Sequence, residues 1–133
     1  MDTRSLVQRR KIMQAVKPKN TSPEIAVRRL LFSRGYRYRV HYQKLPGKPD
    51  IAFPSRRKAI FVHGCFWHGH DCSKGQPPKS NQDYWLPKLQ ANTTRDHKKT
   101  AEIKEMGWEV LIVWQCEIAN KEALVGRLED FLE

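Results

Sequence analysis

Hydrophobic residues recur along the chain with two different spacings, which predict helices and strands. A helix is expected between the sequence NTSPE, at residues 20–24, and Gly35. Its apolar residues fall at the i, i+3, i+4 positions of one face: Val27, Leu30 and Leu31. Thr21 or Ser22 is suited to cap this helix, and glycine is a common residue just beyond a helix end.

Strict alternation of apolar and polar residues predicts a half-buried strand over 36–43. One face carries Tyr36, Tyr38, Val40 and Tyr42, and the other carries Arg37, Arg39, His41 and Gln43. Two short strands, DIAF (50–53) and KAIFV (58–62), are expected around the turn PSRR. The apolar run WEVLIVW (108–114) is suited to a central strand.

The remaining segments complete an α/β pattern. Residues 63–79 favour an irregular loop, and a helical region interrupted near Pro87 continues to about Met106. Asn120 is suited to cap a closing helix. The order helix, three strands, helix, strand, helix predicts an α/β fold with a mixed central sheet flanked by helices. Residues 1–20 are expected to form a basic N-terminal arm, and residues 21–133 a single domain.

Charge separates the front of the chain from its rear. Lysine and arginine total 25 against 14 acidic residues, a net charge of +11. Residues 1–50 carry +10 and residues 51–100 carry +6, whereas residues 101–133 carry −5. A basic front indicates a polyanionic partner such as nucleic acid. The chain offers neither a long apolar run nor a signal peptide, so we expect a soluble, cytosolic protein with no membrane contact.

Cysteines and histidines gather in the sequence FVHGCFWHGHDC, at residues 61–72. If strand 108–114 lies beside strand 58–62, Cys116 emerges at the same sheet edge as this loop. Three thiolates and one imidazole would then fill the tetrahedral shell of a structural zinc site. Spacing alone leaves His68 and His70 as alternatives for the fourth ligand. The competing interpretation, favoured for Cys116 alone, is that reduced cysteines are small buried hydrophobes.

A second cluster of polar residues suggests hydrolytic chemistry. Asp50 begins one predicted strand, and His63 follows the end of the next. A carboxylate with water and phosphate oxygens suits Mg²⁺, and a histidine can move a proton near neutral pH. Taken alone, an aspartate after a proline is more often a residue that caps a strand than a metal ligand.

Four segments together resemble the very-short-patch repair (Vsr) family of DNA mismatch endonucleases. They are LPGKPDIAF, FVHGCFWHGHDC, YWLPKLQANTTRD and GWEVLIVWQCE, and the similarity extends from about residue 9 to residue 130. The resemblance implies a restriction-endonuclease-like fold. It also implies Mg²⁺-dependent hydrolysis of one DNA strand on the 5′ side of the thymine in a T:G mismatch, which arises when 5-methylcytosine deaminates.

The resemblance assigns roles to individual residues. Asp50 matches the family's magnesium-binding aspartate, and the backbone carbonyl of Val62 joins it on the metal. His68 matches a general base that acts through the metal-associated water, and His63 a second catalytic histidine near the scissile phosphate. Glu24 matches the acid that hydrogen-bonds metal-bound water. The residues that match the zinc ligands are Cys65, His70, Cys72 and Cys116.

The same resemblance implies how mismatched DNA is read. Phe66 and Trp67, within the loop, and Trp85 match aromatic residues that intercalate between bases. Met13 matches an apolar residue that the N-terminal arm inserts from the minor groove. Without the family, Phe66 and Trp67 are more often core residues than wedges. The basic residues expected on phosphates are Lys88, Arg95, Lys98 and Lys99.

Other functions compete with this interpretation. A non-catalytic zinc-stabilised DNA-binding module explains the charge and the cysteines but gives no role to Asp50, His63 or His68. A zinc hydrolase needs an open coordination position, which three cysteines and a histidine do not leave. A Vsr-like nuclease of looser specificity, beside a restriction-modification system, is a further alternative. We expect a bacterial monomer that associates with the nucleoid through DNA; contact with other mismatch-repair proteins is left open.

Overall fold

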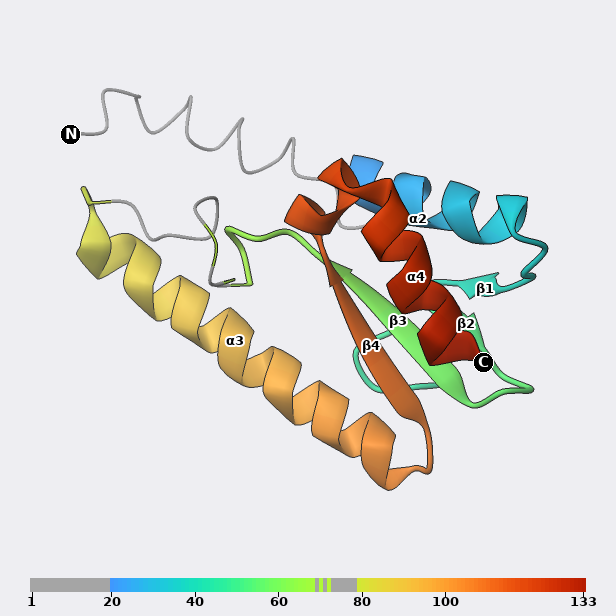
Figure 1. Ribbon diagram of the computed structural model, residues 1–133. Helices are drawn as coiled ribbons and strands as arrows, with labels where there is room; N and C mark the ends of the chain where they lie inside the picture. Colours follow the sequence, from blue (N-terminus) through green and yellow to red (C-terminus); the bar gives the residue numbers. More distant parts are fainter. Residues whose placement is uncertain (1–19, 69, 71, 73–78) are drawn as a thin grey trace.

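The computed structural model describes residues 20–68, 70, 72 and 79–133 (Figure 1). Its elements in chain order are α2 (Ser22–Ser33), β1 (Arg39–Val40), β2 (Ile51–Phe53), β3 (Lys58–His63), α3 (Gln82–Glu105), β4 (Glu109–Trp114), the short 3₁₀ helix η2 (Gln115–Ala119) and α4 (Lys121–Leu132). The predicted order of helices and strands is confirmed, with η2 added. The N-terminal arm, except for its last residue, lies outside the described residues.

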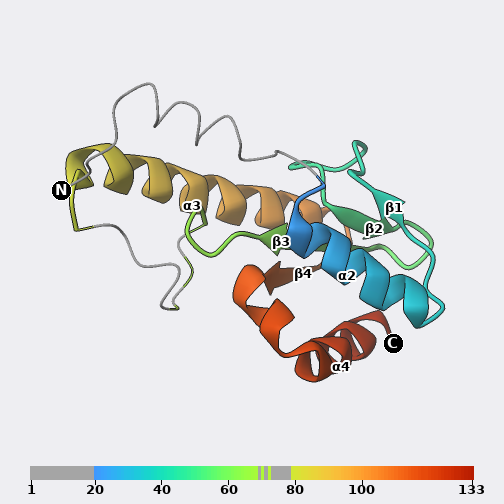
Figure 2. The ribbon, with the colours of Figure 1, turned by 90° about the horizontal axis from the view of Figure 1, so that it is seen from above.

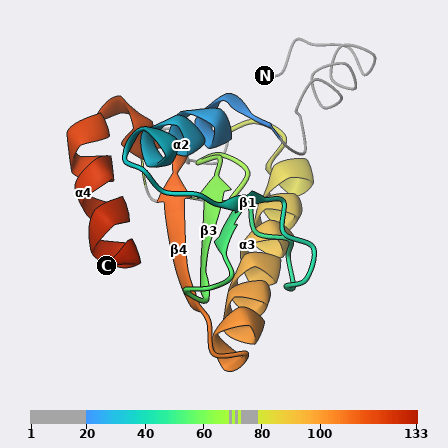
Figure 3. The same ribbon diagram turned by 90° about the vertical axis from the view of Figure 1, so that its right-hand side faces the viewer.

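The strands form one mixed sheet in the order β1-β2-β3-β4. β1 and β3 both pair antiparallel to β2, whereas β3 and β4 run parallel. α3 covers one face of the sheet, and α2 with α4 covers the other, so the molecule has three layers (Figures 2 and 3). The predicted mixed sheet flanked by helices is therefore confirmed. No helix in the described ranges is long and apolar enough to cross a membrane.

Two hydrophobic cores lie on the two faces of the sheet. Ile60 and Val62 of β3 belong to the core beneath α2 and α4, whereas Ala59 and Phe61 belong to the core beneath α3. This alternation follows from the two-residue period of a strand. Because both faces of β3 are covered, residues 59–62 are all apolar, and the last residue of the strand, His63, is buried as well.

β4 occupies the edge of the sheet in the described part of the chain, which corrects the prediction of a central strand. Its apolar run has a different cause, because helices cover both of its faces. Leu111 packs against the core of α2 and α4, while Val110 and Ile112 pack against the core of α3. The apolar run of β4 therefore reflects contact with helices on both faces of the sheet. It does not reflect hydrogen bonding to a strand on each side.

The predicted helix ends are confirmed at α2. The hydroxyl of Thr21 accepts a hydrogen bond from the amide of Glu24 at 3.4 Å, and Pro23 lies in the first turn. Gly35 has a φ of +88°, and the amide of Tyr36 donates to the carbonyl of Leu31 at 3.1 Å. This is the glycine-ended hydrogen-bond pattern that stops many helices. Asn120 caps α4 as predicted.

The strand predicted over 36–43 is much shorter than its alternation suggested. Only Arg39 and Val40 pair with β2, and both side chains are exposed. Tyr36 and Tyr38 still pack against the core beneath α2 and α4. The pairing ends because His41 adopts a left-handed backbone conformation with φ of +47°, which an extended strand does not allow.

Pro87 does not interrupt the helix in which it lies. α3 is continuous for 24 residues from Gln82 to Glu105. Pro87 lies within the first two turns, where its missing N–H leaves only the carbonyl of Asp83 without its helical donor. Asp83 is exposed, so water can satisfy that carbonyl and the helix continues.

Candidate active site and metal centre

Strands β3 and β4 end at the same edge of the sheet and place two groups of polar residues there. Their parallel register pairs His63 with Trp114, the last residues of the two strands. The loop that leaves β3 and the 3₁₀ helix that leaves β4 therefore start side by side. This is the juxtaposition that the sequence analysis required for Cys116 to approach the loop.

The first group comprises the four side chains predicted as zinc ligands. The donor atoms of Cys65, His70, Cys72 and Cys116 all lie within 4.8 Å of one another. The Sγ atom of Cys116 lies 3.5 Å from Nδ1 of His70, and the amide of Cys116 donates to Sγ of Cys65 at 3.4 Å. His68, the alternative fourth ligand, belongs to a different group of donors. We call these four residues the cysteine cluster.

The chemistry of the cysteine cluster fits a soft, closed metal site. All three cysteines of the chain fall in the described part, and the structure joins none of them in a disulfide. Burial, together with the sulfurs of Cys65 and Cys72, raises the pKa of the Cys116 thiol to about 11. A nearby cation would favour ionisation of the Cys116 thiol, and three sulfurs with one imidazole are the donors that tetrahedral Zn²⁺ takes.

Helix α3 holds the loop that carries the cysteine cluster. The side-chain amide of Asn92 donates to the carbonyl of Trp67 at 2.9 Å, and the hydroxyl of Thr93 donates to the carbonyl of His68 at 3.4 Å. An irregular loop has few backbone partners of its own, so such bonds fix its path. The loop is therefore attached to α3 at one point and gathered by the cysteine cluster at another.

The second group lines a cleft of about 940 Å³ beside the cysteine cluster. All the residues predicted to take part in catalysis line it: Glu24 from α2, Asp50 before β2, Val62 and His63 from β3, and His68 from the loop. A shared catalytic role requires these side chains to line one site. The structure brings them together from four separate segments of the chain.

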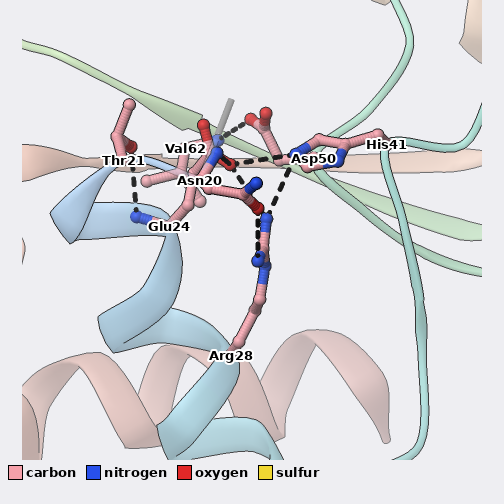
Figure 4. Close-up of polar contacts among 7 residues, drawn as sticks. All are labelled: Asn20, Thr21, Glu24, Arg28, His41, Asp50 and Val62. Carbon is pink, nitrogen blue, oxygen red and sulfur yellow. Dashed lines mark hydrogen bonds and ion pairs between the residues drawn. The ribbon is translucent and has the colours of Figure 1, made fainter. Parts of the chain in front are cut away.

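Asp50 and Val62 are in direct contact at the floor of this cleft. The amide of Val62 donates to Oδ2 of Asp50 at 2.7 Å, so the carboxylate is fixed against the end of β3 (Figure 4). Burial raises the pKa of Asp50 from 3.8 to about 6, although the Val62 hydrogen bond lowers it. The negative charge of Glu24 raises it further. Burial disfavours the ionised form of this carboxyl, and a bound cation would stabilise that form.

His63 and His68 stack face to face in the same cleft, in a donor group with Asp96 that is separate from the group of Asp50. Their ring centroids lie 3.8 Å apart, with an angle of 6° between the planes. Burial and the neighbouring His68 lower the pKa of His63 to about 4, so it is uncharged at neutral pH. Nδ1 of His63 is buried without a hydrogen-bond partner among the described residues. A buried nitrogen of this kind is available to a water molecule, an ion or a substrate atom.

Asp96 orients His68 and was missed by the sequence analysis. Its Oδ2 lies 2.5 Å from Nδ1 of His68, which makes Nδ1 the donor and leaves Nε2 with the lone pair. Asn92, Asp96 and Lys99 follow the i, i+4, i+7 spacing of one helix face, and all three line the cleft. This periodicity was present in the sequence and could have identified the aspartate.

Glu24 lies at the other end of the cleft in a network that was also missed. Its Oε2 lies 3.0 Å from Nη2 of Arg28 and 3.2 Å from Nε2 of His41, and it accepts a bond from the amide of Asn20 at 3.0 Å (Figure 4). His41 was assigned to the polar face of a strand. Its left-handed φ turns it toward the cleft, and no sequence signal predicted that conformation.

A single aromatic ring separates the two groups. Trp114 stacks on His70 of the cysteine cluster, with centroids 4.2 Å apart and an interplanar angle of 15°. The same indole meets His63 edge to face, with centroids 5.2 Å apart. The two sets of donors are thus neighbours across one side chain, yet each keeps its own ligand atoms.

The residues predicted to intercalate form an aromatic cluster beside the cleft. Phe66, Trp67 and Trp85 meet edge to face, with centroids 5.0 to 5.8 Å apart. In the described part of the chain they belong to neither of the two hydrophobic cores. All three are partly exposed. Met13 lies outside the described residues.

The predicted phosphate contacts divide into two kinds. Arg95 and Lys99 line the cleft, on the same face of α3 as Asp96. Lys98 is exposed on α3 but does not line the cleft, and Nζ of Lys88 lies 4.6 Å above the ring of Tyr84. Basic residues therefore lie along α3 between the predicted catalytic residues and the aromatic cluster.

A family model and several individual proteins match this chain, and all of them are DNA endonucleases or nicking enzymes. The family described as "DNA mismatch endonuclease Vsr" matches residues 1–74, more than half of the chain. A type II nicking enzyme of Xanthomonas oryzae pv. oryzae is 56% identical over 132 residues, which cover 99% of this chain and 97% of that protein. A type II nicking enzyme of Neisseria meningitidis is 44% identical, covering 88% of this chain and 84% of that protein. The DNA mismatch endonuclease Vsr of Escherichia coli is 37% identical over 136 aligned residues, covering 98% and 87%.

Proposed function

The chain belongs to the Vsr family of DNA mismatch endonucleases, and on this premise we propose that it nicks one strand of duplex DNA on the 5′ side of the thymine in a T:G mismatch. One observation carries the proposal. Asp50, Val62, His63 and His68 converge in a single cleft, beside a separate cluster of cysteines. A DNA-binding module without catalysis would have no need for these groups to meet.

The carboxylate of Asp50 and the backbone carbonyl of Val62 would hold Mg²⁺. Hard oxygen donors on a buried acid with a raised pKa, in an open cleft that phosphate can enter, fit this cation. When bound, Mg²⁺ would polarise the scissile phosphate and stabilise the leaving oxygen. Glu24 lies within reach of Asp50 and would orient water at the same place.

His68 is the proposed general base. Because Asp96 holds its Nδ1 as a donor, Nε2 can accept a proton from the attacking water. The carboxylate of Asp96 also stabilises the imidazolium that this transfer creates. Asp96 therefore acts through His68 as a positioning residue.

His63 contributes in its uncharged form. Its lowered pKa excludes a stored proton at neutral pH, so we assign it a hydrogen bond through one ring nitrogen to the scissile phosphate. Its ring also supports His68 through the stack. The two histidines thus have different roles: His68 accepts the proton, and His63 positions both His68 and the scissile phosphate.

The cysteine cluster would hold a structural Zn²⁺ through Cys65, His70, Cys72 and Cys116. A closed shell gives no open position for catalysis, which argues against a zinc hydrolase. Its role would be to fix the loop so that Phe66 and Trp67, with Trp85, form a rigid wedge between base pairs. Unstacking a base step costs a few kcal/mol and is easiest at a mismatch.

The rest of the proposed complex follows from the charge distribution. Arg95, Lys98, Lys99 and Lys88 would contact phosphates, and the arm of residues 1–20 would insert Met13 from the minor groove. The domain of residues 21–133 would have the restriction-endonuclease-like fold. It would act as a bacterial monomer on chromosomal DNA.

The test is strand-specific nicking of labelled duplexes. A duplex with one T:G pair and a matched T:A control are incubated with zinc-loaded protein in Mg²⁺, in EDTA added just before the assay, or in Zn²⁺ alone. We expect a nick only in the T:G duplex with Mg²⁺, on the 5′ side of the thymine. Binding without nicking would support the DNA-binding module instead, and nicking with Zn²⁺ alone would support a zinc hydrolase.

One observation favours a second candidate, a Vsr-like nuclease of looser specificity that accompanies a restriction-modification system. The relatives of Xanthomonas oryzae and Neisseria meningitidis described above are both named type II nicking enzymes. The duplex panel above, extended to other mismatches and to all neighbouring bases, separates the candidates. Equal nicking of several mismatches would favour the looser enzyme, whereas confinement to T:G would favour the repair nuclease.

A further inference from the structure

His41 approaches the catalytic cleft and has no role in the proposed mechanism. Its donor nitrogen lies within 4.8 Å of the carboxylate oxygens of Glu24 and Asp50, so the three residues form a third group able to hold a cation (Figure 4). The side chains of His41 and Glu24 are 23% and 4% exposed, so the pair is largely sheltered from water. Sheltered donors of this kind need a compensating partner.

The backbone fixes His41 beside Asp50. The amide of His41 donates to the carbonyl of Asp50 at 3.1 Å, and the next amide, of Tyr42, donates to Pro49 at 3.0 Å. The left-handed φ of +47° then directs the imidazole toward α2 rather than along the strand face. A non-glycine residue rarely adopts this conformation, and such residues are frequent at functional sites.

The spacing of the donors fits an octahedral cation. Two adjacent ligands at about 2.1 Å from such an ion lie about 3.0 Å apart. Nε2 of His41 and Oε2 of Glu24 are separated by 3.2 Å, close to that value. The three donor atoms together span no more than 4.8 Å, a little more than the distance between two opposite ligands.

The hydrogen bonds around His41 are in conflict without a cation. Nε2 lies 3.2 Å from a carboxylate oxygen of Glu24, which can only accept, and 3.1 Å from Nη2 of Arg28, which can only donate. A neutral imidazole nitrogen serves one of these partners but not both. The guanidinium of Arg28 sits 3.0 Å from Glu24 and so supplies a positive charge where the two donors converge. Its separate bond to Asn20 at 2.9 Å gives it a partner when a metal takes that position.

We propose that His41 is a nitrogen ligand of the catalytic cation, which Glu24, His41 and Asp50 hold together, and that this ligand makes the site favour Mn²⁺ over Mg²⁺. The inference rests on the proposed function of the cleft; it adds His41 as a ligand and makes Glu24 a direct ligand in place of the water-mediated role given above. Imidazole binds transition metals better than it binds Mg²⁺, and Mn²⁺ accepts both oxygen and nitrogen donors. The consequence is an enzyme that works with either cation but binds Mn²⁺ more tightly.

The test uses Mn²⁺ as the probe on full-length protein whose cysteine cluster is first saturated with zinc. Pulsed electron paramagnetic resonance detects ¹⁴N coupling to Mn²⁺ when an imidazole is a direct ligand, and the loss of the free-ion signal gives the Kd. The variant is His41→Asn, because asparagine tolerates the left-handed backbone best. The matched control is His97→Asn, at an exposed position on α3 outside the cleft.

We expect ¹⁴N coupling in the wild type and in His97→Asn, and none in His41→Asn. In His41→Asn the Kd for Mn²⁺ should rise about tenfold, and the Kd for Mg²⁺, measured by competition, only about twofold. Coupling that persists in His41→Asn, or a wild type without coupling, overturns the inference. Thermal melting of both variants within a few degrees of the wild type establishes that they are folded.

Nicking of the T:G duplex in Mg²⁺ separates this inference from the proposed function. Wild-type protein that nicks the duplex but shows no ¹⁴N coupling retains the function and loses the His41 ligand. Protein that shows the coupling but never nicks retains the metal site and loses the function. The two proposals can therefore fail independently.

Discussion

The cysteine cluster and the catalytic cleft are neighbours at one edge of the sheet, yet they are built on opposite principles. The cluster gathers four soft donors from the loop and η2 into a closed group. The cleft gathers oxygen donors and two histidines around an open space of about 940 Å³. Trp114 lies between them and touches both. Closure suits a structural metal, and openness suits one that shares its ligands with a phosphate.

This difference shows how a small domain can combine rigidity with reactivity. The loop from β3 contributes to both regions, because Cys65 and His70 belong to the cluster while His68 belongs to the cleft. A metal on one side of the loop would fix the histidine on the other. Variants in the cleft should therefore reduce nicking without reducing stability, whereas variants in the cluster should reduce both.

The largest effect is expected for Asp50→Asn. The amide oxygen can still accept the bond from Val62, but the charge that would hold Mg²⁺ is lost. Nicking of the T:G duplex should fall at least about 1,000-fold, because a metal contributes several kcal/mol to the transition state. DNA binding, measured by fluorescence anisotropy, should change less than about threefold. Retained nicking would show that Asp50 is not needed for catalysis. The cleft would then no longer differ from the cluster by holding a catalytic metal.

The next effect concerns the cluster. Cys116→Ser removes one of its four donors and should lower the stability by about 3 kcal/mol, or the melting temperature by about 10 °C. Metal analysis should find less than one zinc per chain. The matched control, Ala119→Ser, adds the same hydroxyl at an exposed position of η2 and should leave both values unchanged. Unchanged zinc content and melting in Cys116→Ser would show that the cysteines are packing residues.

Asp96→Asn tests the hydrogen bond that orients His68. An amide can present its nitrogen to Nδ1 and favour the wrong tautomer, so nicking should fall about 100-fold while DNA affinity stays constant. Single-turnover rates at saturating DNA measure this loss. The variant should have the same melting temperature as the wild type, because Asp96 is not one of the proposed zinc ligands. A loss of affinity instead of rate would make Asp96 a DNA-binding residue.

Asp50→Asn should also change the stability of the fold, by a smaller amount than its effect on nicking. It should raise the stability, whereas Cys116→Ser lowers it. The pKa of Asp50 is raised to about 6 in the folded protein, so its ionised form destabilises the fold above pH 6 by about 3 kcal/mol. Without Mg²⁺, Asp50→Asn should melt several degrees above the wild type at pH 8. The gain should shrink as the pH falls from 6 to 4 and vanish near pH 3, where the carboxyl is protonated in both states. A gain that does not depend on pH would have another cause.

The smallest effects should come from the basic residues of α3. Lys99→Ala removes a positive charge that lines the cleft and should weaken DNA binding about threefold, or by less than 1 kcal/mol. The loss should be equal for T:G and T:A duplexes, because phosphate contacts carry no sequence information. Titrations at several salt concentrations should show a slope reduced by about one. A larger loss of affinity for the T:G duplex than for the T:A duplex would show that Lys99 helps to recognise the mismatch.

Local patterns predicted the elements where one physical cause dominated. The cap at Thr21, the stop at Gly35 and the cap at Asn120 depend on residues within one helical turn, and all three were correct. The predictions failed where distant segments decided the outcome. The run at β4 is apolar because helices cover its two faces, and the strand around residue 40 ends because His41 turns toward α2.

By itself the sequence determined the kinds of groups present and the residues that share a family pattern. It placed cysteines with a histidine in one loop, and Asp50 and His63 at strand ends. Only the tertiary structure decided which of them meet: the parallel pairing of β3 with β4 brings Cys116 to the loop, and α3 brings Asp96 to His68. The physical reason is that donor chemistry belongs to each residue, whereas a shared site needs separations of a few ångströms between segments far apart in the chain.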